Sequence, residues 1–499
     1  MTFPSRPRIV VTLTARDHVG SRTQIREALE DGADLAEVRV DRWSPEERRS
    51  LSALFPSPLP LVATYRSRAE GGEGEPLRRA EALEELATFP FAYLDLEVAR
   101  DLPLEGELAR RMGRPEAPQP LFSAHLPRGS SPKDLHRLLS EVGTARAPAK
   151  VVMFANLDTL LTEVLPGLPP PTARPYVVHT TGPSGPLLRA WARRLGMALV
   201  FAAPGRSRSA GSVEESQIPC DRLARFLHGA PDAPLFALLG HPVSHSISPE
   251  LHERWMEMAG VEGMYLLLDV ASSSEFVGAV PVLGAGGFRG VNVTHPFKRD
   301  ALAVAIRAGR AAERAGCANV LTFREGEVEA ENTDVAAVIR RVRELRDEAK
   351  VDPDRVTVVG AGGAARAALT ALEALGLSAE VVARDPVRAS ALAAEFGAEV
   401  RDPTVGSPAS LFIHATPAGR RECPELGIPL LRLVGRDSYI LDFVHAPLHR
   451  FLEERAARHG ARYEDGRALL AYQAAESFAL WWGVPVDPQE LKRAARGGS

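Results

Sequence analysis

The sequence has little cysteine, no long apolar run and no excess of either charge. Its 499 residues include three cysteines, which stand alone at positions 220, 317 and 423. Isolated cysteines exclude a disulfide framework and offer no zinc-ligand spacing, so we expect a reducing compartment and no metal. No apolar run could span a bilayer, and the first residues pass into a strand-like run without a signal segment. We therefore expect a cytoplasmic protein.

Charge is balanced along the chain. Lys and Arg number 60 and Asp and Glu number 64, which gives a net charge of −4. A chain without a basic field has no general attraction for nucleic acid or for an anionic membrane, so we expect neither as a partner. The length predicts two to four domains. Composition leaves the oligomeric state open, and the function has to be sought in local motifs.

Short apolar runs recur through the first 205 residues at intervals of roughly 25–30 residues. Helix-like stretches such as TQIREALEDGA and SPKDLHRLLSEV separate them. Eight alternations of strand and helix predict an α/β fold that begins with a (β/α)8 barrel. The eight predicted strands lie in residues 8–15, 35–40, 60–67, 91–97, 120–126, 150–156, 175–181 and 198–204.

Several of these runs carry polar residues two apart near their C-terminal ends. In LAEVRVDRW, residues 35–43, Glu37 and Arg39 share one face of the strand and the valines share the other. Because active sites of such barrels lie at the C-terminal ends of the strands, we expect an inward-facing polar ring at one mouth. Asp41, one step further, either orients Arg39 or caps the next turn of the chain. Similar pairs are Thr12 and Thr14, Thr64 and Arg66, Asp95 and Glu97, and Ser123 and His125.

A stretch rich in Pro and Ala near residues 226–235 ends the barrel, and βα alternation then resumes with a different spacing. The C-terminal helical stretch, LLAYQAAESFALWWG, is expected to pack back on the second domain. We predict three domains: the barrel over 1–228, a second α/β domain over 235–345 and 466–499, and a Rossmann-type domain over 346–465.

A glycine turn directly follows the apolar strand at 356–359 and opens a helix. Glycines there allow a tight turn and let the backbone approach a pyrophosphate, so the pattern predicts dinucleotide binding. The next strand ends at Arg384, with Arg388 one turn further on, and an arginine there favours the 2′-phosphate of NADP. Asp385 follows directly and leaves the preference over NAD open. The turn fits G-x-G-x-x-A with Gly360, Ala361, Gly362, Gly363, Ala364 and Ala365, of which the first five are expected to contact the cofactor.

Four polar segments of the second half stand at predicted strand or helix ends. Taken alone, Ser248 is explained as a helix N-cap and Lys298 as a solvated lysine at a strand end. Their neighbours favour a shared site instead. The segments are HPVSHSISPELH with Ser246 and Ser248, VNVTHPFKRD with Asn292, Thr294 and Lys298, CANV with Asn319, and ENTD with Asp334.

The order of these motifs resembles that of the shikimate dehydrogenase family. HPVSHSISP, NVTHPFK, GCANVL, ENTD, VVGAGGAARA, HATPAG and YEDGRALLAYQAAESFALW follow one another through about 260 residues. The resemblance implies an NADP cofactor near Thr416, Phe443 and Gly466. It also implies that shikimate or 3-dehydroshikimate is held by Ser246, Ser248, Asn292, Thr294, Asn319, Asp334 and Gln473.

By the same resemblance, Lys298 and Asp334 form the catalytic pair. A lysine ammonium beside a carboxylate can protonate the alkoxide that develops when a ketone is reduced. The chain departs from the family at two places. His445 stands where a tyrosine is usual, and the turn after Asp385 lacks the usual hydroxyl residue.

The first half resembles type I 3-dehydroquinate dehydratase, a (β/α)8 barrel family that forms a Schiff base between a lysine and its substrate. AEVRVD, TYRSRAEGGE, FSAHL and AKVVMFAN occur in that family's order. The resemblance implies that Lys150 forms the imine and that His125 moves the neighbouring proton. Burial and nearby arginines would lower the lysine pKa and leave the amine nucleophilic.

Further barrel residues follow from that resemblance. Glu70 is expected to support His125. The family's Ser-Ala-Pro-Gly-Gln is replaced by SAGSVEESQ at 209–217, so the lid around the glutamine departs from the family. The residues expected to hold the substrate carboxylate and hydroxyls are Glu37, Arg39, Arg66, Arg189 and Gln217.

The leading hypothesis is a bifunctional enzyme of the shikimate pathway of aromatic amino acid biosynthesis. The barrel would dehydrate 3-dehydroquinate to 3-dehydroshikimate, and the second half would reduce that product to shikimate with NADPH. One alternative is a regulator that binds these ligands without catalysis, but it would not need Lys150, His125, Lys298 and Asp334. Another is a quinate/shikimate dehydrogenase that uses NAD, which Arg384 and the serine pair disfavour.

Overall fold

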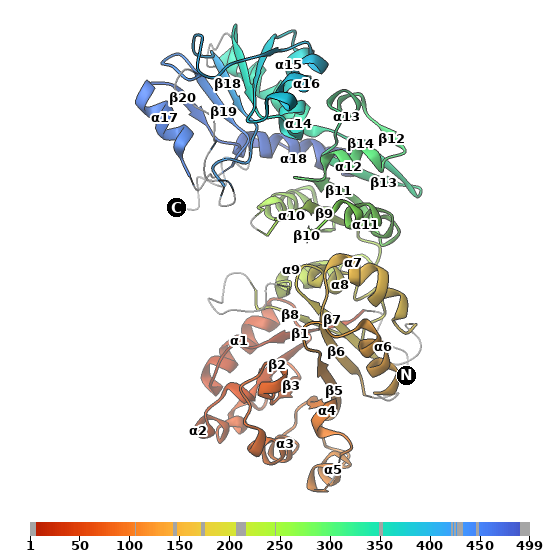
Figure 1. Ribbon diagram of the computed structural model, residues 1–499. Coiled ribbons are helices and arrows are strands. Elements are labelled where there is room, and N and C mark those ends of the chain that lie inside the picture. Colours follow the sequence, from red (N-terminus) through yellow and green to blue (C-terminus); the bar gives the residue numbers. More distant parts are fainter. Residues whose placement is uncertain are drawn as a thin grey trace. The chain divides into compact units, whose positions relative to one another are not determined.

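The structure is a computed structural model, and it describes residues 6–104, 106–142, 147–170, 175–205, 216–244, 246–348, 353–420, 423, 426, 433–445 and 449–489 (Figure 1). The chain divides into two compact units. One comprises residues 1–234 and 262–270, and the other comprises 235–261 and 271–499. Each is described by itself.

The first unit is a nearly closed barrel of parallel strands, in the order β7-β6-β5-β4-β3-β2-β1-β8. Each predicted run coincides with one strand, so the (β/α)8 prediction is confirmed. Between β7 and β8 the Ala198 amide donates to Tyr176 O, and the Phe201 amide donates to Nε2 of His179 at 3.0 Å. The strands are β1 (Arg8–Thr12), β2 (Leu35–Arg39), β3 (Leu61–Thr64), β4 (Tyr93–Glu97), β5 (Gln119–His125), β6 (Ala149–Phe154), β7 (Tyr176–Thr181) and β8 (Leu199–Ala202).

Helices alternate with these strands and cover the outside of the barrel (Figure 1). Their ends follow ordinary capping chemistry. In α6, Ser131 and Asp134 form a capping box, and Leu135, Leu138 and Leu139 bury one face. The helices are α1 (His18–Glu30), α2 (Pro45–Arg48), α3 (Arg79–Leu86), α4 (Val98–Asp101), α5 (Gly106–Met112), α6 (Pro132–Glu141), α7 (Leu157–Thr159), α8 (Gly185–Ala190) and α9 (Cys220–His228).

The inside of the barrel is layered with the period of two that strands impose. An apolar cluster inside it is formed by Val10, Leu35, Val62, Leu121, Val177, Leu199 and Phe201, all of them buried. Two residues further along five of these strands stand Thr12, Glu37, Thr64, Ser123 and His179. These polar side chains therefore share the inward face, which is where the prediction from LAEVRVDRW placed Glu37.

Two further six-stranded sheets follow, and every strand in them except β10 lies in the second unit. In the first, of order β10-β9-β11-β13-β14-β12, β9 and β11 are parallel while β11, β13 and β14 are antiparallel. Helix α18 packs back on this sheet as expected, with the Trp481 ring 4.9 Å from that of Phe236. The strands are β9 (Leu235–Gly240), β10 (Met264–Asp269), β11 (Phe288–Val293), β12 (Arg307–Ala308), β13 (Val320–Arg324) and β14 (Glu327–Glu331). The helices are α10 (Ser248–Ala259), α11 (Ser273–Ala285), α12 (Lys298–Ala303), α13 (Arg310–Ala315), α14 (Thr333–Glu348) and α18 (Arg467–Trp482).

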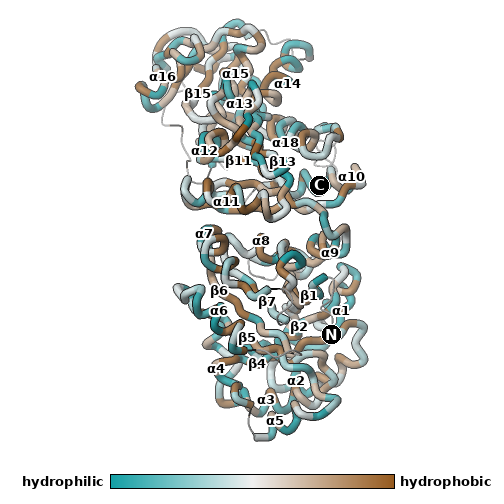
Figure 2. The backbone as a smooth tube through the Cα atoms, turned by 90° about the vertical axis from the view of Figure 1, so that its right-hand side faces the viewer, coloured by the Kyte–Doolittle hydropathy of each residue, from teal (hydrophilic) through white to brown (hydrophobic). Residues whose placement is uncertain are grey.

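The other sheet is parallel throughout, with the order β17-β16-β15-β18-β19-β20. Numbered from β15, this is the 3-2-1-4-5-6 order of the dinucleotide-binding fold, so the Rossmann-type prediction is confirmed. The central strands β15, β18 and β19 are buried along their whole length, and β15 has the brown of hydrophobic residues in Figure 2. The strands of this sheet are β15 (Val356–Val359), β16 (Ala379–Val382), β17 (Glu399–Val400), β18 (Leu411–His414), β19 (Tyr439–Asp442) and β20 (Arg462–Glu464), with helices α15 (Gly363–Ala374), α16 (Pro386–Phe396) and α17 (Phe451–His459).

The three sheets fall inside the three predicted domains, whose boundaries stay a prediction. Within the described ranges, no helix is long and apolar enough to cross a membrane. Among the same residues, no group of three or more His, Cys, Asp or Glu side chains is placed to hold a metal ion.

Candidate active sites

Lys150 lies inside the barrel near the start of β6, buried with only 4% of its surface exposed. Its Nζ is 3.7 Å from Oε1 of Glu37 and 3.7 Å from Oδ2 of Asp95. The Phe201 ring covers the ammonium from another side, with its centroid 3.8 Å from Nζ. The lysine is therefore enclosed by two carboxylates and an aromatic face, and it is not the solvated strand end that an isolated lysine would suggest.

Burial acts in opposite directions on the pKa values of Lys150 and Glu37. It lowers the pKa of the Lys150 ammonium against the opposing effect of Glu37 and Asp95, and Arg66 and Arg39 lower it further. Burial also acts to raise the pKa of Glu37. Lys150, Arg39 and the hydroxyls of Thr12 and Thr64 outweigh that effect and bring this pKa down to about 2. Glu37 is thus a fixed anion beside an amine that gives up its proton more readily than an exposed lysine.

His125 ends β5 and is held by Glu70. One oxygen of Glu70 accepts from the His125 backbone N–H at 2.9 Å and lies 3.1 Å from Nδ1 of its ring. Burial lowers the pKa of His125 well below its usual value, and Arg66 and Lys150 lower it further. Burial also raises the pKa of Glu70 to about 7, in spite of the opposing charge of Arg66. The imidazole is therefore a neutral base, as the predicted role requires.

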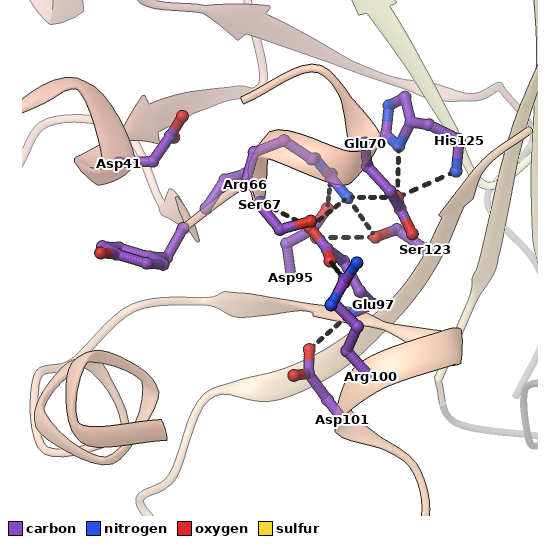
Figure 3. A network of polar contacts seen from close by, with 12 residues as sticks. Asp41, Arg66, Ser67, Glu70, Asp95, Glu97, Arg100, Asp101, Ser123 and His125 are labelled. Carbon is purple, nitrogen blue, oxygen red and sulfur yellow. Dashed lines mark hydrogen bonds and ion pairs between the residues drawn. The ribbon is translucent and has the colours of Figure 1, made fainter. Parts of the chain in front are cut away.

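Arg66 links Glu70, the partner of His125, to Asp95 and Ser123 (Figure 3). Its guanidinium donates to Asp95 at 2.8 Å, to Ser123 at 2.8 Å and to Glu70 at 3.1 Å. Ser123 in turn donates to the other oxygen of Asp95 at 2.7 Å. Asp95 thus joins this network to Lys150, so Arg66 is buried among carboxylates and holds the lysine and the histidine in one arrangement.

Of the two open roles for Asp41, the structure selects the first. β2 ends at Arg39, and Asp41 lies in the following 3-10 turn, Val40–Arg42. Its two oxygens accept from Nε and Nη2 of Arg39 at 2.9 and 2.8 Å. Asp41 thus fixes the guanidinium in a bidentate pair.

Two barrel residues differ from their expected settings. Arg189 is buried and donates to the carbonyl oxygens of Phe201, Thr180, Gly185 and Ser216, so these donors serve the backbone in this conformation. The Oε1 atom of Gln217 is buried and has no hydrogen-bond partner among the described residues. Residues 209–215 of the segment expected to form the lid lie outside the described residues. A substrate role for Arg189 and Gln217 stays a prediction.

The second unit holds a cavity of about 540 Å³ between the ends of β11 and β15. This cavity is lined by every residue of the second half that was predicted to bind shikimate or the dinucleotide. They are Ser246, Ser248, Asn292, Thr294, Lys298, Asn319, Asp334, Gly360, Ala361, Gly362, Gly363, Ala364, Arg384, Arg388, Thr416, Phe443, Gly466 and Gln473. His445, which departs from the family, lines it too.

Lys298 and Asp334 form the charged pair of this cavity. Lys298 is the first residue of α12, and Asp334 lies in the first turn of α14. The Lys298 Nζ donates to Oδ2 of Asp334 at 2.5 Å, and both side chains are mostly buried. An ammonium held against a carboxylate at the edge of a cavity can deliver a proton to a bound oxygen.

Comparison with known proteins gives matches to both halves of the chain. A family model for type I 3-dehydroquinase matches residues 9–228, and one for the shikimate dehydrogenase substrate binding domain matches residues 238–321. Shikimate dehydrogenase (NADP(+)) of Acidiphilium cryptum is 37% identical over 268 residues, which are 52% of this chain and 95% of that protein. The chain belongs to the shikimate dehydrogenase family. Its N-terminal part is a type I 3-dehydroquinase, so the predicted fusion is confirmed.

Other relatives cover the same half. Shikimate dehydrogenase (NADP(+)) of Dinoroseobacter shibae is 36% identical over 273 residues, 52% of this chain and 97% of that protein. Among solved structures, shikimate 5-dehydrogenase from Thermus thermophilus in complex with NADP(H) and shikimate is 35% identical, with a TM-score of 0.46 over 53% of this chain and 99% of that one.

The remaining polar residues of the shikimate dehydrogenase half form two groups. Ser246 donates to Ser248 at 3.1 Å. Helix α10 begins at Ser248 and its cap is Ile247, with no side-chain cap bond, so the alternative of Ser248 as N-cap is wrong. The Ser248 hydroxyl is therefore not used as a helix cap, and Ser248 lines the cavity.

The second group is tied together across strands and helices. Asn292 donates to Ser477 of α18 at 2.9 Å. Asn319 donates to Oε1 of Gln473 at 3.3 Å and accepts from the Thr333 backbone N–H at 2.8 Å. The amides are thereby fixed in orientation before any ligand arrives.

Asp385 has a clear structural role in the glycine-turn region. Its side chain caps α16 by accepting from the backbone N–H groups of Val387 and Arg388 at 3.0 and 3.3 Å. Arg384 and Arg388 line the cavity beside it and are exposed. A carboxylate engaged as a helix cap competes less for a ribose, which favours the arginines as the recognition groups here.

Several residues of these sites were not among the predicted ones. Asp95 and Ser123 in the barrel had a signal, because they stand in the period-two polar pairs of their strands. Thr333 and Ser477 had only weak signals, since a hydroxyl in a helix is common. His414 and Asp442 end neighbouring strands and are paired in register, which only the sheet reveals.

Proposed function

We propose that the chain is a bifunctional enzyme that converts 3-dehydroquinate to shikimate in two steps. Its barrel dehydrates 3-dehydroquinate to 3-dehydroshikimate, and its second half reduces 3-dehydroshikimate with NADPH. The observation that carries the proposal is that each half holds a lysine in a prepared site: Lys150 between Glu37 and Asp95, and Lys298 on Asp334. The product of the first reaction is the substrate of the second.

In the barrel, the lysine amine attacks the substrate ketone. Loss of water leaves an imine, and the imine withdraws electrons from the neighbouring carbon. His125 takes a proton from that carbon and returns a proton to the hydroxyl that leaves as water. A water molecule then hydrolyses the imine, which releases 3-dehydroshikimate and restores the Lys150 amine. The lowered pKa of Lys150 supplies the free amine, and Glu37 and Asp95 stabilise the positive charge on its nitrogen.

The glycine turn fits a dinucleotide. A Cβ on Gly362 would meet no atom within 4 Å, so this position opens on free space at the start of α15. Gly360 has a φ of +132°, and a Cβ there would lie 2.5 Å from the Ala415 carbonyl oxygen. The N-terminal N–H groups of α15 can bind a pyrophosphate at this opening. Arg384 and Arg388 are placed to bind a 2′-phosphate.

NADPH, when bound, supplies the hydride for the substrate ketone. Lys298 then donates a proton to the carbonyl oxygen and stabilises the charge that develops there. Asp334 orients the ammonium. Asn292, Asn319 and Gln473, which are held by their neighbours, bind the substrate hydroxyls, and Ser246 and Ser248 bind its carboxylate.

The remaining parts of the proposal concern organisation and place. We retain three domains, over 1–228, over 235–345 with 466–499, and over 346–465. No cysteine of the described chain is in a disulfide, and the expected cytoplasmic location remains a proposal.

A coupled assay tests the proposal. Purified protein with 3-dehydroquinate and NADPH should show the enone absorbance first and then loss of the nicotinamide absorbance. Lys298→Ala should abolish reduction while dehydration continues, and Lys150→Ala should abolish dehydration while added 3-dehydroshikimate is still reduced. Binding of these ligands without turnover would instead support the non-catalytic regulator.

A further inference from the structure

A buried chain of hydrogen bonds leads from β20 to the cavity of the shikimate dehydrogenase half. Tyr463 donates to Oδ2 of Asp442 at 3.1 Å. The other oxygen of Asp442 lies 2.7 Å from Nδ1 of His414, and Nε2 of His414 lies 2.6 Å from the hydroxyl of Thr416. His414 is completely buried and Asp442 is 2% exposed, whereas Thr416 is half-buried and lines the cavity.

The register of the sheet brings the residues of this hydrogen-bonded series together. His414 and Asp442 are the last residues of β18 and β19 and are paired directly across the parallel ladder. Thr416 follows β18 after one residue, and its methyl group would lie 3.3 Å from a Cβ on Gly360. Thr416 therefore adjoins the glycine turn.

The proton positions follow from the acceptors. We assign His414 the tautomer with its proton on Nδ1, because a carboxylate accepts at that atom, and Nε2 is then an acceptor. The Thr416 O–H donates to it. One lone pair of the same oxygen accepts from the Ala418 backbone N–H at 3.1 Å. A single lone pair remains, and it is the hydrogen-bonding capacity that Thr416 offers to a ligand.

The strand order says which half of the cofactor meets this lone pair. The chain leaves β15 for β16 and β17 on one side and then crosses to β18 on the other. A dinucleotide lies across the point where the order reverses. Arg384, after β16, marks the adenosine side, so Thr416, after β18, marks the nicotinamide side.

We propose that His414 is a positioning residue, which together with Asp442 fixes the Thr416 hydroxyl as an acceptor for an N–H or O–H donor on the nicotinamide half of NADP. The inference rests on the proposed function and deepens it. The donor is either the carboxamide N–H or a hydroxyl of the adjoining ribose.

The test measures the dissociation constant for NADP+ by calorimetry on the full chain. Thr416→Val, which keeps the shape and loses the hydroxyl, should weaken binding roughly threefold to tenfold, the effect of one net hydrogen bond. Thr416→Ser should restore binding to within about twofold of wild type. His414→Asn keeps a donor toward Asp442 but is too short to reach Thr416, and it should weaken binding about as much as Thr416→Val.

The double variant decides the issue. If His414 acts through the hydroxyl, His414→Asn with Thr416→Val binds NADP+ no more weakly than Thr416→Val alone. The proposal would be overturned if the fold-changes in the dissociation constant for His414→Asn and Thr416→Val multiplied in the double variant. It would also be overturned if Thr416→Val bound NADP+ as tightly as wild type. If His414→Asn unfolds, His414→Gln places an amide oxygen near the position of Nε2, and wild-type binding is expected.

Two further arms separate the alternatives. The 3-acetylpyridine analogue of NADP+ has no amide N–H, so loss of the Thr416→Val effect with it identifies the carboxamide, and persistence identifies the ribose. If the wild-type protein binds NADP+ but does not reduce 3-dehydroshikimate, the proposed function is wrong, while the comparison of NADP+ dissociation constants among the variants still tests the role of His414. If the wild-type protein reduces 3-dehydroshikimate but the fold-changes of the two single variants multiply in the double variant, only the proposed role of His414 is wrong.

Discussion

The side chain of Lys298 lies directly against Gly363 of the glycine turn. A Cβ on Gly363 would be 3.0 Å from Cδ of Lys298 and 3.6 Å from the Cys317 sulfur. At its other end the lysine is held by Asp334 at 2.5 Å. The element that receives the cofactor and the residue that we propose delivers the proton are therefore packed in contact.

Gly363→Ala is expected to lower kcat for reduction by roughly tenfold, because a Cβ would push Lys298 out of line with the substrate oxygen. Gly362→Ala serves as the comparison, since its Cβ would meet no protein atom and would point toward the bound phosphate instead. That variant should raise KM for NADPH more than it lowers kcat. Steady-state kinetics measure kcat and KM for both variants. If the two variants changed kcat and KM in the same proportions, the argument from the contact between Lys298 and Gly363 would be contradicted.

Sodium borohydride should trap Lys150 on 3-dehydroquinate as a stable secondary amine. The reason is that the imine at this buried amine is reduced before it can hydrolyse. Peptide mass spectrometry locates the adduct. Lys133, an exposed lysine on α6, is the internal control and should be unmodified. An adduct only at Lys133, or none, would exclude the imine at Lys150.

The dehydration rate should fall as the pH drops through about 7, where Glu70 takes up a proton. Ionised Glu70 requires a proton on Nδ1 of His125 and leaves Nε2 as the base, whereas protonated Glu70 can donate to Nδ1 and favours the opposite tautomer. The pKa of His125 itself lies well below 6.5 and cannot produce this limb. Glu70→Gln should remove the limb from the pH–rate profile of kcat and lower the plateau. A limb that persists in the variant would assign it elsewhere.

Arg384→Ala should raise KM for NADPH by roughly tenfold or more and change KM for NADH little, because only NADPH carries the 2′-phosphate. Asp385 is engaged at the N-terminus of α16, so we expect no compensating gain for NADH. Arg458→Ala, at an exposed arginine on α17, is the matched control. Equal changes for the two cofactors would remove the phosphate role of Arg384.

Much of the architecture could be predicted because strand and helix periods are local. The run LAEVRVDRW shows both the success and its limit. Its alternation placed Glu37 inside the barrel, but the strand stops at Arg39 and turns so that Asp41 folds back on the guanidinium. That turn depends on one side-chain pair, which no period records.

The parts that could not be predicted are those that depend on partners far apart in sequence. Asp95 meets Lys150, and His414 meets Asp442, only because parallel strands bring them to one level. The N-cap interpretation of Ser248 failed for a different, local reason. A serine before a proline fits a cap locally, yet the helix already includes it and Ile247 occupies the cap position.

The layered interior of the barrel has a consequence for how such a chain can change. Apolar Leu35 and charged Glu37 occupy successive inward levels of β2. One residue inserted before Glu37 within this strand would turn the carboxylate outward, put the inserted residue at its level beside Lys150, and bring Val38 to the inward level of Arg39. Insertions in the loops shift nothing inside. Length variation among relatives of this barrel should therefore be confined to the connections, with the strands keeping their residue count.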